Sequence, residues 1–213
     1  KHPLTANSAH REAIQLVLNH TKPDRDTMRS ALYMIIQDSH RAGQILTDIR
    51  ALFFKPDGGH EPIDANEIAS GVLRLFHEEL KAHGVTTRVE LAPDLPLVMG
   101  HKGQLQEVLV NLLQNAMEAM NAVKVGRRRL WLRTERHGDD TIIVEVKDSG
   151  PGINPANLNG IFDAFFTTKS HGTGLGLAIC RMIIERHGGQ LTASSDGKNG
   201  SLFQFVLPTS SHH

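Results

Sequence analysis

The spacing of hydrophobic residues divides the chain into two parts. From Asp24 to Phe54 apolar side chains recur every three or four positions, which predicts one long helix whose stripe is close to a heptad repeat. A shorter stripe of the same period runs from Leu4 to Val17, and Pro23 separates the two. The pattern predicts a helical hairpin. A helix of about 30 residues is about 45 Å long, so dimerisation as a four-helix bundle would cover the remaining stripe. Packing of the hairpin on the rest of the same chain is the alternative.

A different pattern follows a Pro- and Gly-containing linker at residues 56–59. Asp64 with Glu67 predicts a capping box that opens a helix through about Ala82. Two further helices are expected at residues 102–123 and 174–187, and strands at residues 85–91, 97–99, 128–136, 141–148, 190–194 and 202–207. Strands interspersed with helices and joined by hairpins predict an α+β fold, an α/β sandwich in which helices cover one face of a mixed sheet.

The expected domains are therefore a helical hairpin at residues 1–56, a second domain at residues 60–208, and a tail or tag remnant at residues 209–213. Because the chain begins at Lys1, we expect it to be a fragment of a longer protein with a truncated hairpin.

Composition narrows the possible classes of function. The 23 Lys and Arg residues balance 23 Asp and Glu residues, so the chain has no net positive charge that would attract nucleic acid. No apolar run approaches the ~18–20 residues that span a bilayer. The single cysteine, Cys180, forbids an internal disulfide and favours a reducing compartment. These features predict a cytoplasmic location for this portion of the protein.

Polar residues in the predicted helix at 102–123 form a first candidate site. Glu107, Asn111 and Asn115 are spaced by four residues and so share one helical face. A row of carboxamides can hold a hydrated Mg²⁺ without neutralising it, which leaves its charge available for phosphates. A solvated polar face is the alternative explanation of the same spacing.

A second candidate follows the predicted strand at 141–148. Asp148 ends the strand, and Gly150 and Gly152 come directly after it. A carboxylate in this position can accept a hydrogen bond from an exocyclic amine, while the glycines let the backbone pass close to a flat ring. A tight turn would account for these residues equally well.

Glycines at alternate positions open the last predicted helix: Gly172, Gly174 and Gly176. Their backbone amides, together with the helix N-terminus, favour phosphate oxygens, and Lys169 can add a positive charge. No Gly-Lys-Ser or Gly-Lys-Thr follows, which excludes a Walker loop, and the late position in the chain excludes a dinucleotide fingerprint. The specific feature is the order of the motifs, each suited to a different part of one ligand.

Segments 111–115, 148–152, 162–166 and 172–176 resemble the N-box, first glycine box, F-box and second glycine box of two-component sensor histidine kinases. These belong to the ATPase superfamily shared with gyrase, Hsp90 and MutL. The resemblance covers residues 64–208, and the hairpin resembles the family's dimerisation and phosphotransfer region. It implies that Asn115 coordinates Mg²⁺ and that Asp148 binds the adenine amine. The residues that it assigns to ATP binding are Asn111, Asn115, Asp148, Gly150, Gly152, Ile153, Thr167, Thr168, Lys169, Gly172, Thr173, Gly174, Leu175, Gly176, Leu177 and Ser201.

The resemblance implies an ATP-dependent protein histidine kinase that is homodimeric through the hairpin. Such a core transfers the γ-phosphoryl group of Mg·ATP to a histidine, from which it passes to an aspartate of a response-regulator receiver domain. Residues 3–6 resemble the stretch that follows the phosphoacceptor histidine, so we expect that histidine upstream of Lys1. A regulatory scaffold or phosphatase-type module that binds ATP without autophosphorylation is an alternative. An ATPase of the gyrase or Hsp90 kind is another, although the short separation of Phe166 from Gly172 favours the kinase.

Overall fold

The computed structural model describes residues 59–169 and 172–210. All of them belong to one compact unit, Lys55–His213. The predicted helical hairpin and its dimer interface lie outside the described residues, as do residues 211–213.

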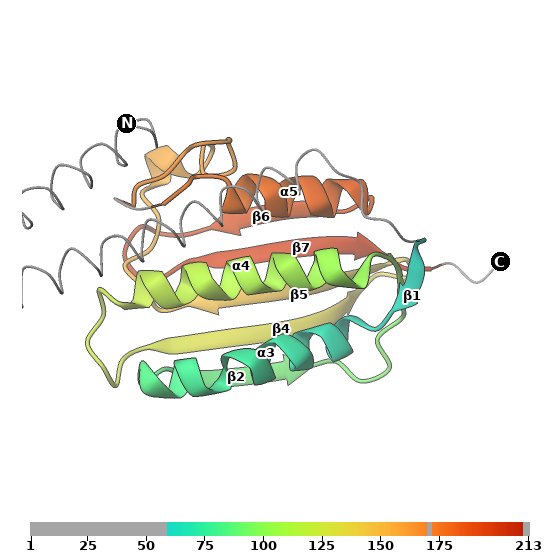
Figure 1. Ribbon diagram of the computed structural model, residues 1–213, viewed down its shortest axis with the longest axis horizontal. Coiled ribbons are helices and arrows are strands. Elements are labelled where there is room, and N and C mark those ends of the chain that lie inside the picture. Colours follow the sequence, from blue (N-terminus) through green and yellow to red (C-terminus); the bar gives the residue numbers. More distant parts are fainter. Residues whose placement is uncertain (1–58, 170–171, 211–213) are drawn as a thin grey trace, which may run out of the picture. The chain divides into compact units, whose positions relative to one another are not determined.

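A five-stranded mixed sheet forms the centre of the fold, with the strand order β2-β4-β5-β7-β6 (Figure 1). β2 runs parallel to β4, and the other neighbouring strands are antiparallel. The predicted mixed sheet is therefore confirmed. The strands are β2 (Thr86–Leu91), β4 (Arg129–His137), β5 (Thr141–Asp148), β6 (Gln190–Ser194) and β7 (Leu202–Pro208).

Three helices cover one face of this sheet (Figure 1): α3 (Ala65–Ala82), α4 (Lys102–Met120) and α5 (Gly176–Arg186). The core lies between the two layers, because strand residues alternate between a buried apolar side and a more exposed side. The buried strand residues are Leu130, Leu132, Ile142, Val144, Val146, Phe203, Phe205 and Leu207. The opposite side is more exposed and includes charged residues, among them Arg133 and Glu135, which form an ion pair at 2.6 Å. The predicted α+β arrangement of a mixed sheet and helices is confirmed.

Two short elements were not predicted. β1 (Glu61–Ile63) pairs antiparallel with β3 (Val98–Gly100), and a 3₁₀ turn, η1, spans Pro155–Asn157. Three residues are too few to show a period, and a proline inside β1 argues against a strand on local grounds. β1 forms because its last residue, Ile63, is buried against the core.

The start of α3 corrects the predicted capping box. Asp64 does cap the helix and accepts a hydrogen bond from the Asn66 N–H at 2.8 Å. Glu67, however, forms an ion pair with Lys102 at 2.7 Å. The Glu67 carboxylate, which would complete the box, instead pairs with Lys102, the first residue of α4, which is its neighbour only in the tertiary structure.

The chain remains part of the fold just beyond β7. Thr209 bridges to Val98, and the Ser210 N–H donates a hydrogen bond to the Leu97 carbonyl at 2.8 Å. These two residues were assigned to the tail on sequence grounds, yet their backbone is bonded to the fold. None of the helices in the described part of the chain is long and apolar enough to cross a membrane.

His187 joins the end of α5 to the start of α4. Its side chain is 6% exposed, its Nδ1 donates to the Ile183 carbonyl at 2.7 Å, and its Nε2 accepts the His101 N–H at 3.0 Å. A side chain on Gly100 would place its Cβ 2.6 Å from His187 Nε2, so the backbone and the ring are in close contact. Burial lowers the pKa of His187 below its ordinary value of 6.5; the Ile183 carbonyl opposes this shift, and His60 and His101 add to it.

We expect acid to destabilise the domain through this residue. Because the folded pKa is depressed, the unfolded chain binds the proton more readily, so the stabilisation is complete above about pH 6.5 and is lost as the pH falls toward the folded pKa. The slope for one proton is at most about 1.4 kcal/mol per pH unit. The free energy of unfolding, measured with urea at several pH values between about 7.5 and 5, should therefore depend less steeply on pH for His187→Gln than for the unmodified chain.

His77→Gln is the matched control for the loss of an imidazole, because the His77 side chain is 72% exposed on α3. If the free energy of unfolding depended equally steeply on pH in the unmodified chain and in His187→Gln, the assignment of the acid sensitivity to His187 would be contradicted.

Candidate functional site

One face of α4 forms the wall of the candidate site. Asn111, Asn115 and Ala119 are spaced by four residues and so follow one another along this face. Over these eight residues the helix rises about 12 Å. The neighbouring apolar side of α4 is buried in the core through Leu105, Leu109 and Leu112, which fixes the rotation of the helix. The predicted polar face is therefore held in one orientation.

At one end of this wall, Asn111 meets the beginning of α5. A Cβ on Gly176, the first residue of α5, would lie 3.0 Å from Asn111 Oδ1. The amide nitrogen of Asn111 donates to the Glu107 carbonyl at 3.3 Å, which leaves the amide oxygen turned toward α5. The absence of a side chain at Gly176 thus allows the N-terminus of α5 to approach α4.

The N-terminus of α5 has the properties of an anion site. The N-cap residue of α5 is Leu175, whose side chain makes no capping hydrogen bond, and the first turn of α5 carries no acidic residue. The partial positive charge of a helix N-terminus favours phosphate oxygens. The preceding loop is tightly built: Gly174 has φ 71°, and its carbonyl accepts the Phe165 N–H at 2.8 Å. A Cβ at Gly174 would lie 2.5 Å from the Phe165 carbonyl carbon.

In the middle of the wall, Asn115 contacts a cation supplied by the chain itself. Lys169 Nζ donates to Asn115 Oδ1 at 2.7 Å and forms a closer ion pair with Glu118. The amide oxygen predicted to bind Mg²⁺ therefore faces a position that a positive charge already occupies. Thr167 shapes this segment, because its Oγ1 accepts the Lys169 N–H at 3.1 Å. The predicted neighbour Thr168 is exposed.

At the other end of the wall lies the buried carboxylate of Asp148, which is 2% exposed. Its Oδ1 accepts the Gly150 N–H at 2.6 Å, and its Oδ2 accepts the Ser201 hydroxyl in a short hydrogen bond. Burial raises the pKa of Asp148, and the Ser201 hydroxyl and Gly150 N–H partly offset this rise. Each carboxylate oxygen has two lone pairs, so the group can accept a further donor from a ligand.

Two glycines allow the segments around Asp148 to meet. A Cβ on Gly150 would lie 3.0 Å from the Ala119 Cβ, so the loop after β5 rests directly on α4. Gly200 has φ 92°, and a Cβ there would collide with the Asp148 carbonyl and lie 2.8 Å from its carbon. Ser201 can reach Asp148 only because its neighbour has no side chain.

Ser195 organises the next loop and was missed by the sequence analysis. Its Oγ accepts the Ile153 N–H at 2.9 Å and donates to the Gly200 carbonyl at 2.6 Å. A Cβ on Gly152 would lie 2.7 Å from the same oxygen. Ser195 thus ties the predicted residues Gly152 and Ile153 to the turn that precedes Ser201. Its position at the start of a Gly- and Asn-rich turn was the available signal.

The predicted residues therefore form three groups along α4. Asn111 meets Gly176 at the start of α5, Asn115 meets Lys169, and Asp148 meets Gly150 and Ser201 beside Ala119. An elongated ligand fits this order if it has hydrogen-bond donors at one end and anionic groups at the other. Amide oxygen is a ligand suited to Mg²⁺, and the Lys169 ammonium at Asn115 shows that this oxygen accepts a cation.

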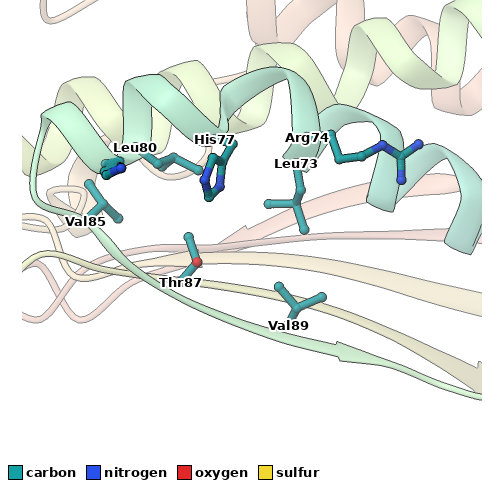
Figure 2. A pocket seen from close by; sticks show the side chains of 8 residues that line it. Leu73, Arg74, His77, Leu80, Val85, Thr87 and Val89 are labelled. Atoms are coloured by element: carbon teal, nitrogen blue, oxygen red, sulfur yellow. The ribbon is translucent and has the colours of Figure 1, made fainter.

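A separate groove of about 570 Å³ lies between α3 and β2 (Figure 2). Its lining residues are Leu73, Arg74, His77, Leu80, Lys81, Val85, Thr87 and Val89. None of the residues predicted to bind nucleotide lines this groove, so it is distinct from the candidate site.

Comparison with known proteins places the chain in a family. Residues 100–211 match the model of the family described as histidine kinase-, DNA gyrase B-, and HSP90-like ATPase. The chain is 33% identical over 98% of its length to the sensor histidine kinase TmoS of Ectopseudomonas mendocina, and 34% identical over 97% of its length to the sensor protein FixL of Bradyrhizobium diazoefficiens. It spans 22% and 41% of the length of these relatives.

Solved structures agree. The catalytic domain of the histidine kinase ThkA covers 71% of the chain, and 97% of that domain is covered, with a TM-score of 0.63 and 33% identity. ThkA in complex with the response regulator protein TrrA covers 98% of the chain, and 59% of that structure is covered, with a TM-score of 0.80 and 25% identity. The chain belongs to the histidine kinase, gyrase B and HSP90-like ATPase family, and the proteins it resembles are sensor histidine kinases of two-component signal transduction.

We expect Gly200→Ala to destabilise the domain far more than Gly138→Ala. Both glycines have positive φ, 92° and 65°, but a Cβ at Gly138 has nothing within 4 Å. Gly138→Ala isolates the backbone strain, about 1 kcal/mol. Gly200→Ala adds the collision with Asp148 and should cost about 3 kcal/mol or more. Urea unfolding measures both, and equal losses would show that the close approach at Asp148 is not rigid.

Proposed function

We propose that this chain is the ATP-binding core of a sensor histidine kinase. The observation that carries the proposal is the buried Asp148 carboxylate, which Gly150 and Ser201 hold beside the helix that carries Asn115. The family match and the names of the relatives support ATP as the ligand and a histidine as the phosphoryl acceptor.

In this proposal the adenine lies at the Asp148 end. Its exocyclic amine donates to the Asp148 carboxylate, Ser201 takes part through the same carboxylate, and the backbone at Gly150, Gly152 and Ile153 passes close to the ring. Asp148 can accept this further hydrogen bond because Gly150 and Ser201 each donate to a different carboxylate oxygen, and each oxygen has two lone pairs.

The phosphates lie at the opposite end of the wall. The backbone of Gly172–Leu177 and the N-terminus of α5 donate to phosphate oxygens, and Lys169 adds a full positive charge beside Thr167 and Thr168. Asn115 holds Mg²⁺ and Asn111 supports the same side. The metal neutralises charge on the phosphates when bound, and the protein itself mainly positions groups and stabilises spread charge in this type of transfer.

The names of the relatives support an acceptor histidine and a response-regulator partner for this proposal. The γ-phosphoryl group passes to a histidine upstream of Lys1, on a hairpin that forms the homodimer, and then to an aspartate of a receiver domain. The complex of ThkA with the response regulator TrrA supports this partner class. The cytoplasm, where ATP is available, is the compartment that suits this reaction.

The direct test is incubation of a version extended upstream of Lys1 with ATP labelled in the γ-phosphate. We expect acid-labile, base-stable label on the protein, as a phosphohistidine gives, and its loss when the upstream histidine is replaced by glutamine. Nucleotide binding without label would support a regulatory or phosphatase-type module instead. Steady release of phosphate with no protein label would support an ATPase of the gyrase or HSP90 kind.

Asp148→Asn tests the adenine contact. The substitution replaces one carboxylate oxygen with an amide donor, and we expect ATP affinity to fall by about 1–3 kcal/mol, or roughly 5- to 150-fold. Calorimetric titration measures the loss. GTP has no amine at the corresponding ring position, so its affinity should change much less. Asp139→Asn is the control, since Asp139 is 99% exposed at the β4–β5 turn. Unchanged ATP affinity in Asp148→Asn would remove the assignment.

A further inference from the structure

Among the described residues, Glu118 is the only one that forms an ion pair with Lys169. Neither the sequence motifs nor the family comparison pointed to Glu118. We propose that Glu118 is a positioning residue that sets nucleotide affinity by holding the Lys169 ammonium on Asn115. The inference rests on the proposed function, because it concerns the cation and phosphate side of the same site.

The geometry joins three side chains from two distant parts of the chain. Asn115 and Glu118 are three residues apart on α4 and so lie on neighbouring positions of its surface. Lys169 is 54 residues from Asn115 in sequence and reaches both from the segment before α5. Its Nζ is 2.7 Å from Asn115 Oδ1 and closer still to the Glu118 carboxylate.

The contact is open to an incoming ligand. The side chains of Lys169 and Glu118 are 44% and 57% exposed, so neither is locked in the core. An ammonium group carries three donors and no acceptor, and its donors at this position point at the oxygens of Asn115 and Glu118. The amide oxygen that the proposed function assigns to Mg²⁺ is therefore in use before any metal arrives.

Two cations compete for one oxygen in this arrangement. The Lys169 ammonium repels a Mg²⁺ ion that approaches Asn115 Oδ1, so metal binding favours movement of the ammonium away from this oxygen, and the ATP phosphates offer it another anion. Glu118 opposes this exchange because its carboxylate retains Lys169. An exposed ion pair changes such an equilibrium only modestly, by about two- to fivefold. Glu118 thus tunes affinity rather than deciding whether nucleotide binds.

Glu118 also affects phosphate binding directly, because its negative charge repels an anion. This direct repulsion does not need Lys169, whereas the proposed effect of Glu118 on affinity acts through Lys169. A double-mutant cycle separates the two, since the coupling between Glu118 and Lys169 measures only what passes through their contact.

The experiment measures ATP affinity of the 213-residue chain by calorimetry in EDTA, without divalent metal, for the unmodified chain, Glu118→Gln, Lys169→Met and the double variant. Glu118→Gln should tighten metal-free ATP binding about two- to fivefold when Lys169 is present. In the Lys169→Met background the same change should give less than about 1.5-fold. The coupling should shrink at high salt, because exposed charges are screened.

Glu67→Gln is the matched control. Glu67 forms another exposed ion pair with α4, to Lys102 at 2.7 Å, but at the opposite end of the helix from Asn115. Removing that charge should leave ATP affinity unchanged in both backgrounds.

Equal gains from Glu118→Gln with and without Lys169 would overturn the inference, since Glu118 would then act by repulsion alone. The inference would also be overturned if Glu118→Gln left ATP affinity unchanged in both backgrounds. A third contrary result would be that none of the four chains binds metal-free ATP while the unmodified chain binds Mg·ATP. If the unmodified chain bound neither form of ATP, the proposed function itself would fail, which distinguishes the two failures.

Discussion

The buried carboxylate of Asp148 is the constraint on which the rest of the site depends. A charged group that is removed from water is costly unless donors compensate it, and here the donors are the Gly150 N–H and the Ser201 hydroxyl. Meeting this requirement brings the end of β5, the loop after it and the start of β7 together. It also explains why Gly200 must lack a side chain, since the donor could not otherwise approach.

The second constraint is the packing of α4. Its apolar side is buried between the sheet and the neighbouring helices, so its rotation about its own axis is fixed by side chains that take no part in the site. The carboxamides of Asn111 and Asn115 therefore face the segments before α5 and at its start, and Ala119 faces Gly150. A single helix aligns parts of the chain that are far apart in sequence.

The end of the site at Asp148 and its middle around Asn115 differ in how exposed their contacts are. Around Asp148 the groups are buried and tightly packed, which suits recognition of a flat ring of fixed shape. Around Asn115 the contacts are made by the exposed side chains of Lys169 and Glu118, and an exposed ion pair is weak. In the proposed function, the phosphates and the metal ion would bind at the exposed middle of the site, and the base at the buried end.

Local periodicity was enough to determine most of the elements: β5 has the predicted bounds of Thr141–Asp148, and the alternation of its buried residues defined the covered face of the sheet. The sequence alone also showed the four motifs at residues 111–115, 148–152, 162–166 and 172–176 in their order along the chain. Tertiary structure alone decided the β1–β3 pairing, the bond from Ile153 to Ser195 across 42 residues, the link of His101 to His187 across 86, and the contact of Lys169 with Glu118. A repeat of two or 3.6 residues records which face of an element is buried, but not which distant side chain will meet it, because that depends on how all the elements pack together.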